Sequence, residues 1–159
     1  PPRSTLFPYT TLFRSYSDES RTEELLYIQA RQIIDFSAAY DVHDSLTKEH
    51  IGTIRRRGWQ SLARDEWFIL DASGQSVAIL IEDTLRYALL RRLLLGSLLP
   101  QDYDILIGET CIADLKQRFN WLRYELDLDF SPDPSNRLDR RLGIAAGVLL
   151  AIVEGKQDN

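Results

Sequence analysis

The chain has 159 residues, of which 44% are hydrophobic and 27% charged, a composition typical of a single globular domain. Its formal net charge of −5 argues against a nucleic-acid-binding protein. A single cysteine, Cys111, excludes an intrachain disulfide, and with only two histidines a zinc cluster is not expected. No secretory signal peptide is recognisable, and we expect a cytoplasmic protein.

The first fifteen residues differ in character from the rest. Residues 5–15 read TLFPYTTLFRS, which resembles the translation of a short-read sequencing adapter. We therefore interpret residues 1–15 as a disordered segment foreign to the natural chain. Residues 16–159 are then expected to form one domain that lacks part of its natural N-terminus. The alternative is a genuine, disordered N-terminal tail.

Apolar segments joined by short polar turns dominate the middle of the chain, the pattern of β-hairpins. Three hairpins are predicted, over 40–44 with 50–55, 67–71 with 77–81, and 103–107 with 111–116. Two further strands are predicted over 25–31 and 123–130, and in the second, apolar and charged residues alternate. The uneven spacing favours a meander that closes on itself over a solenoid.

Two segments break this β pattern. A helix is predicted over 83–95, with Asp83 as its cap and Gly96 as its end. Its basic, leucine-rich end is expected to cover one opening of the barrel, the alternative being a place in a membrane interface. A second helix is predicted over Asn136–Gly155, capped by Asn136.

The C-terminal helix should be buried at the centre of the domain. Leu142–Val153 has no charged residue over twelve positions. At 1.5 Å per residue it spans ~18 Å, well short of the ~30 Å hydrocarbon core of a bilayer. Because the segment is apolar all round and rich in glycine and alanine, protein should surround it on every side.

Two stretches carry a family resemblance. The strand, loop and helix over 126–150, and the basic strand end and following aromatic strand over 55–67, resemble the tubby C-terminal-like superfamily. This superfamily includes tubby-like proteins, LURP-one-related proteins and phospholipid scramblases. The resemblance implies an α+β, mainly β fold: a closed or near-closed antiparallel β-barrel around a hydrophobic C-terminal helix.

Basic residues concentrate in one part of the chain. Residues 51–95 hold seven arginines and five acids, whereas the flanking segments are net acidic. Guanidinium groups suit phosphate, and the resemblance implies phosphoinositide headgroups as the ligand. The candidate residues are Arg55, Arg56, Arg57, Arg64, Arg91 and Arg92. The alternative is a solvated strand end whose arginines pair with nearby acids.

We therefore expect a monomeric, non-enzymatic protein that binds anionic phospholipid or a membrane surface, without a cofactor. The sequence has neither a nucleophile elbow nor a glycine-rich phosphate loop. A protein-interaction scaffold without a small ligand is the alternative. Scramblase-type lipid translocation is the least favoured reading, because the longest apolar run is too short.

Two weaker candidates remain. The resemblance to scramblases points to Asp127, Asp129 and Asp133 as calcium ligands, although their spacing is not that of an EF-hand and a solvated face is the alternative. His43 and His50 flank one turn and could form a pH-sensitive pair, the alternative being exposed turn residues. Cys111 is expected to pack as a small buried side chain.

Overall fold

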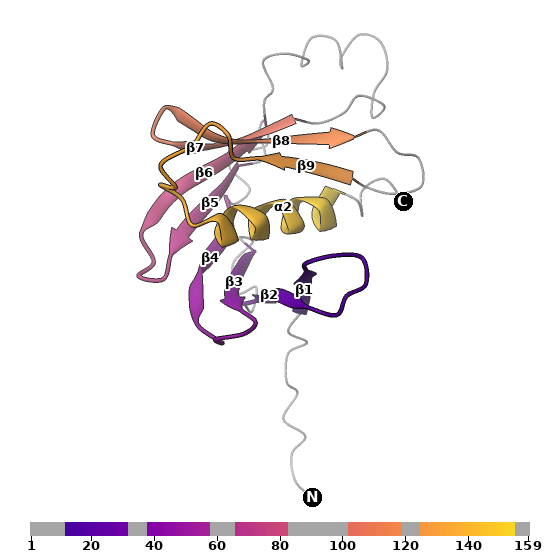
Figure 1. The fold of residues 1–159 in the computed structure, drawn as a ribbon. Helices are drawn as coiled ribbons and strands as arrows, with labels where there is room; N and C mark the ends of the chain where they lie inside the picture. Colours follow the sequence, from indigo (N-terminus) through magenta and orange to yellow (C-terminus); the bar gives the residue numbers. More distant parts are fainter. Residues whose placement is uncertain (1–11, 32–37, 58–65, 83–101, 119–124, 155–159) are drawn as a thin grey trace, which may run out of the picture.

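The computed structural model describes residues 12–31, 38–57, 66–82, 102–118 and 125–154 (Figure 1). Nine strands and a helix, α2 (Arg140–Glu154), lie within these ranges. The strands are β1 (Leu12–Tyr16), β2 (Glu24–Ala30), β3 (Ala39–Asp44), β4 (His50–Arg56), β5 (Glu66–Asp71), β6 (Ser76–Glu82), β7 (Asp102–Ile107), β8 (Thr110–Arg118) and β9 (Glu125–Asp129).

The strands form one antiparallel meander in which each strand pairs with the next along the chain, from β1 to β9. The three predicted hairpins are confirmed as β3–β4, β5–β6 and β7–β8. Gly74 and Gly108, with φ of 84° and 62°, supply the left-handed conformation that two of these turns require. The mainly β character of the domain is therefore established by short-range signals in the sequence.

The expected closed barrel is not formed by the described strands. The sheet order begins at β1 and ends at β9, and no pairing joins these two strands. Instead the sheet curves around α2, which contacts β2, β4 and β9 and lies between the two halves of the sheet in Figure 1. The helix thus fills the concave side, while the edges of the sheet stay apart.

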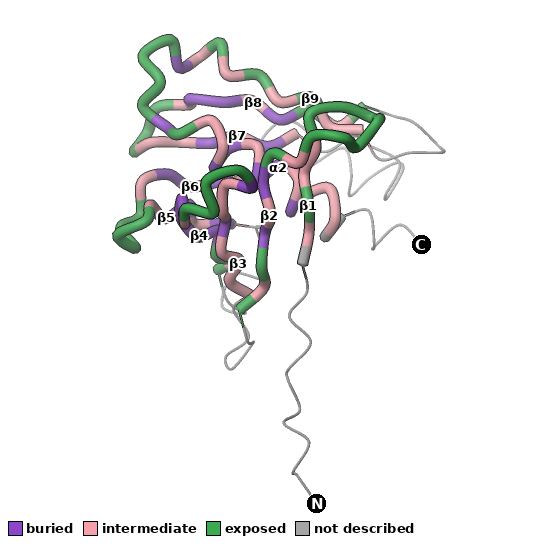
Figure 2. Tube along the Cα trace, turned by 60° about the horizontal axis from the view of Figure 1, so that its bottom comes forward, coloured by how far each residue is buried: buried purple, intermediate pink, exposed green. Residues whose placement is uncertain are grey.

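Strand alternation directs one set of side chains toward α2 and the other set outward. Figure 2 shows buried positions alternating with more exposed ones along the strands. The largest fully buried side chains, all less than 2% exposed, make up a single core with the helix. They are Leu26, Ile28, Ile54, Trp67, Ile69, Leu80, Tyr103, Ile105, Ile112, Leu115, Leu138 and Leu149.

Small residues let the helix approach the sheet closely. A Cβ atom on Gly52 of β4 would lie 2.2 Å from the Leu70 carbonyl oxygen and 3.0 Å from Leu142 Cδ2 of the helix. Central helix positions such as Ala145 and Ala146 are at most 1% exposed. The predicted burial of the C-terminal helix is confirmed for these positions.

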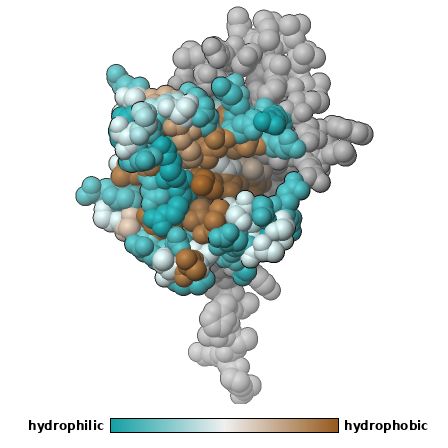
Figure 3. Space-filling view, viewed as in Figure 1, coloured by the Kyte–Doolittle hydropathy of each residue, from teal (hydrophilic) through white to brown (hydrophobic). Residues whose placement is uncertain are grey.

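The helix is not enclosed on every side, however. Ile144 and Val148, one turn apart, are only partly buried. Figure 3 shows apolar surface at the centre of this face, where α2 lies in the view of Figure 1. This partial exposure follows from the open sheet.

The helix begins later than the sequence predicts. Asn136 adopts a left-handed φ of 50° and does not cap the helix. Asp139 does so instead, since its carboxylate accepts a hydrogen bond from the backbone N–H of Arg141 at 2.9 Å. The Arg141 guanidinium also pairs with Asp44 at 3.0 Å, which fixes the start of α2 against β3. The correct capping residue lies three positions beyond the predicted one.

Some predictions concern residues at or beyond the limits of the described ranges. The predicted helix over 83–95 lies outside the described residues. Residues 12–15 belong to β1 and pair with β2, whereas the foreign origin of 1–15 stays a prediction. In the described ranges, no helix is both long enough and apolar enough to cross a membrane.

Candidate functional site

The arginines at the end of β4 face different sides of the sheet. Arg55 lies opposite Phe68 in the ladder, and its Cζ is 5.6 Å from the centroid of that ring. Arg56 lies opposite Trp67, with its Cζ 5.5 Å from the indole ring. Because Trp67 belongs to the core and Phe68 does not, Arg56 faces the concave side and Arg55 the outer side.

Arg57 follows the strand and is engaged differently. Its backbone N–H donates to the Glu66 carbonyl at 2.9 Å, and its guanidinium forms an ion pair with the Glu66 carboxylate. The three described candidates therefore share a strand end without converging on one face. The other candidates, Arg64, Arg91 and Arg92, lie outside the described residues.

On the concave side, Arg56 covers a cluster of aromatic rings. The centroids of Trp67 and Tyr40 are 6.2 Å apart, and those of Tyr40 and Phe13 are 6.3 Å apart. Burial raises the pKa of Tyr40, and the positive charge of Arg56 offsets part of this rise. The phenol therefore stays protonated at neutral pH and is available as a hydrogen-bond donor.

The indole nitrogen of Trp67 is the unusual feature of this cluster. Trp67 is 1% exposed, and its Nε1–H is one of two buried side-chain polar groups without a partner in the described parts of the chain. Leaving a buried donor unpaired costs about 1–3 kcal/mol, so such a group calls for an explanation. An indole N–H and a guanidinium offer only donors, which together suit a ligand rich in acceptor oxygens.

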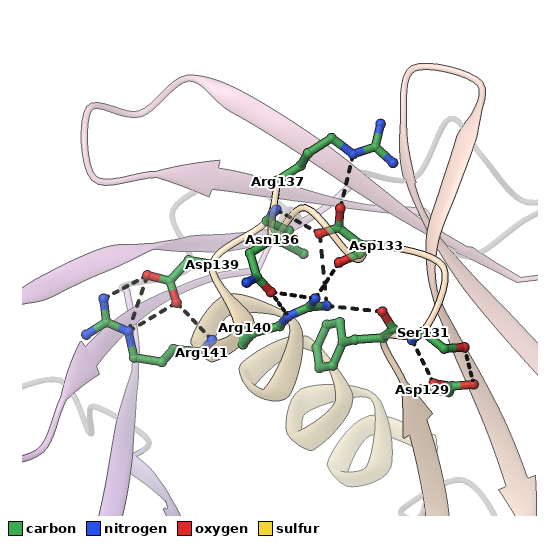
Figure 4. Close-up of polar contacts among 10 residues, drawn as sticks. Asp129, Ser131, Asp133, Asn136, Arg137, Asp139, Arg140 and Arg141 are labelled. Atoms are coloured by element: carbon green, nitrogen blue, oxygen red, sulfur yellow. Dashed lines mark hydrogen bonds and ion pairs between the residues drawn. The ribbon is translucent and has the colours of Figure 1, made fainter.

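The three aspartates predicted as calcium ligands have separate protein partners. Asp127 pairs with Arg118 at 2.5 Å on the outer face. Asp129 accepts hydrogen bonds from the backbone N–H and hydroxyl of Ser131, both at 2.8 Å (Figure 4). Asp133 lies in the loop that leads into α2.

Asp133 is fully buried and organises the loop before the helix. Its carboxylate accepts hydrogen bonds from Arg137 Nε at 3.1 Å and from the Leu138 N–H at 3.3 Å (Figure 4). Burial acts to raise the pKa of Asp133, but these hydrogen bonds outweigh it and hold the pKa below its usual value. Its geometry is that of a structural carboxylate.

A different set of possible metal-ligating groups lies on the outer face of β7 and β8. Ligand atoms of Asp104, Cys111 and Asp114 lie within 4.8 Å of one another. Cys111 is half-buried there and faces the aspartates, which differs from the small buried group expected from the sequence. Burial and the negative charges of Asp104 and Asp114 raise its pKa to about 11, so the thiol is protonated at neutral pH.

The sequence reasoning located the basic strand end but missed Trp67 as its partner. Strand alternation could have revealed this contact. Adjacent arginines of one strand face opposite sides of the sheet, so only one of them can cover a core aromatic residue of the neighbouring strand. Comparison with known proteins adds no further assignment. No family model, curated protein or solved structure matches this chain.

Proposed function

We propose that this protein is a non-enzymatic binding module that recognises anionic phospholipid headgroups at a membrane surface. The observation that carries the proposal is the unpaired, buried indole N–H of Trp67 next to the Arg56 guanidinium. A phosphate group supplies acceptor oxygens for both donors, and a guanidinium binds phosphate through charge-assisted hydrogen bonds. Arg55 adds positive charge at the same strand end, whereas the charge of Arg57 is balanced by its ion pair with Glu66.

The expected strength is modest. Each arginine near an anionic membrane surface contributes about 1 kcal/mol, so Arg55 and Arg56 together contribute about 2 kcal/mol, roughly a 30-fold change in affinity. The net charge of −5 repels an anionic membrane from the rest of the surface, so binding is expected at this strand end. We therefore propose a cytoplasmic protein that binds membranes peripherally and reversibly.

The fold supports the proposal in outline. A meander of antiparallel strands that holds an apolar C-terminal helix in its concave side is compatible with the tubby C-terminal-like resemblance. We propose that relationship together with the function. A protein-interaction scaffold is the second candidate, favoured by the open sheet edges β1 and β9 and by the partly exposed Ile144 and Val148.

Vesicle flotation separates the two candidates. We expect binding to phosphatidylcholine vesicles that contain a phosphoinositide and none to phosphatidylcholine alone. Arg56→Gln and Trp67→Phe should reduce the bound fraction strongly. Arg118→Gln is the matched control, since it removes an equal charge from an ion-paired, exposed arginine on β8. Replacing Arg55, Arg56 and Arg57 together by alanine without loss of flotation would refute the lipid proposal.

A further inference from the structure

A row of three rings crosses the outer face of β2, β3 and β4. Tyr27 lies opposite His43, and His43 lies opposite His50. The rings of Tyr27 and His43 stack in parallel, with centroids 4.6 Å apart and planes 3° apart. Those of His43 and His50 are 5.2 Å apart. The row therefore places both histidines of the sequence next to each other.

A shift in strand register creates this pairing. The ladder pairs Val42 with Gly52 and His43 with His50, so Ile51 is an extra residue in β4. Ile51 is buried in the core, and the shift turns His50 to the outer face beside His43. A bulge that re-aims a side chain in this way is common next to functional sites.

His43 carries the second unpaired buried atom of the described residues. Its Nδ1 is inaccessible to solvent and has no hydrogen-bond partner. A neutral imidazole has a nitrogen lone pair available for a metal ion.

The carboxylate of Asp41 lies next to the His50 ring. Asp41 Oδ1 lies 3.5 Å from His50 Nε2. Asp41 is itself fixed by Arg31 Nε and by the Thr53 hydroxyl, each at 2.7 Å. A carboxylate behind a histidine ring is the usual arrangement that orients a metal-binding imidazole.

We propose that His43 and His50 bind a divalent transition-metal ion of the class that prefers imidazole, namely Zn²⁺, Ni²⁺ or Cu²⁺, with Asp41 as a positioning residue. Metal–nitrogen bonds of about 2.1 Å put each ring centroid about 3.2 Å from the ion, and a tetrahedral angle then separates the centroids by about 5.2 Å. The observed separation is 5.2 Å. The spacing of the two rings therefore fits two imidazole ligands of one ion.

The test is titration of the untagged full chain with NiCl₂, followed by calorimetry and by proton NMR of the histidine rings. Because the sequence has only two histidines, their ring signals identify the site directly. We expect one ion per chain and simultaneous broadening of both histidine signals. His43→Gln or His50→Gln should abolish this binding. Asp41→Asn should weaken it about 10–100-fold without removing the response of the ring signals.

Cys111→Ser is the control for the competing Asp104, Cys111 and Asp114 cluster, and it should leave the affinity unchanged. The proposal is overturned if about 1 mM Ni²⁺ produces neither heat nor broadening of the histidine signals. It is equally overturned if either histidine variant binds like the wild type, or if Cys111→Ser abolishes binding. The ring signals of the wild type decide the matter even if a variant does not fold.

Discussion

Two glycines of the C-terminal helix provide a matched pair for testing how α2 packs. Gly143 and Gly147 lie one turn apart on the buried side of the helix. A Cβ atom on Gly147 would lie 3.5–3.9 Å from methyl groups of Leu115, Leu126 and Leu128, which is ordinary contact. A Cβ atom on Gly143 would lie 2.5 Å and 2.6 Å from two carbons of the Phe130 ring. The same substitution should therefore have opposite effects at the two positions.

The magnitudes follow from helix propensity and from packing. Alanine is favoured over glycine in a helix by about 1 kcal/mol, so Gly147→Ala should stabilise the protein by up to that amount. At Gly143, the added methyl group must displace the Phe130 ring, which also holds Arg140 with its Cζ 4.3 Å from the ring centroid. Overpacking of this kind costs about 1–3 kcal/mol, which leaves a net loss of about 0–2 kcal/mol. The two variants should differ by roughly 1–3 kcal/mol.

Urea unfolding followed by circular dichroism measures this difference, provided that the transitions are two-state with equal slopes. For a domain of this size the same difference corresponds to roughly 2–12 °C between the two melting temperatures. If Gly143→Ala is as stable as Gly147→Ala, Phe130 does not pack on Gly143 as described. The docking of the helix between β9 and the rest of the sheet would then need revision.

Two further predictions concern single side chains. Asp133 has a lowered pKa, so its stabilising effect is complete above the unfolded-state value of about 3.9 and is lost as pH falls through the lower folded value. Asp133→Asn should accordingly lower the melting temperature at pH 7. It should also make the decrease in melting temperature between pH 5 and pH 3 smaller than in the wild type. An unchanged melting temperature at pH 7 would contradict the structural role of Asp133. For Cys111, a pKa of about 11 leaves ~0.1% thiolate at pH 8. A thiolate with a higher pKa is the better nucleophile, which offsets part of this effect. Iodoacetamide should therefore modify Cys111 in the folded protein about 20-fold more slowly than in the urea-unfolded protein. Equal rates would show that the thiol is not held as described.

Much of the fold could be predicted because its signals are local. The hairpin β5–β6 is marked by the turn around Gly74, and β9 by strict alternation of apolar and acidic residues. The helix is marked by its uncharged run. Its first residue was misplaced because Asn136 and Asp139 are both good caps, and the sequence does not show which of them adopts the left-handed conformation. That choice depends on the Asp133 loop.

The closure of the sheet could not be predicted, because it depends on contacts between the most distant strands. Local patterns predict β9 as a strand, whereas β1 lies almost wholly in residues 1–15, where no strand is predicted. The separation of these two strands is set by what packs between them. The sequence also could not reveal the bulge at Ile51, which depends on how β3 and β4 register. Without it, His43 and His50 are only two histidines that flank the same turn.

The candidate site was predicted in part. The sequence identified the basic strand end, but a charge count does not distinguish Arg56, on the core side, from Arg55, on the outer side. The alternation of a strand would have separated them. The unpaired Nε1–H of Trp67 is visible only in three dimensions, because it depends on every group packed around the indole. Its proposed role as a donor therefore could not come from the sequence.

The central claim is that Trp67 and Arg56 bind an anionic headgroup, and the indole N–H signal of Trp67 tests it most directly. The sequence has three tryptophans, so ¹H–¹⁵N spectra contain three indole signals, and Trp67→Phe assigns the relevant one. Addition of a soluble, short-chain phosphoinositide should move this signal downfield, and Arg56→Gln should abolish the movement. An unchanged Trp67 signal at concentrations that saturate the protein, or the same movement in Arg56→Gln, would contradict the account.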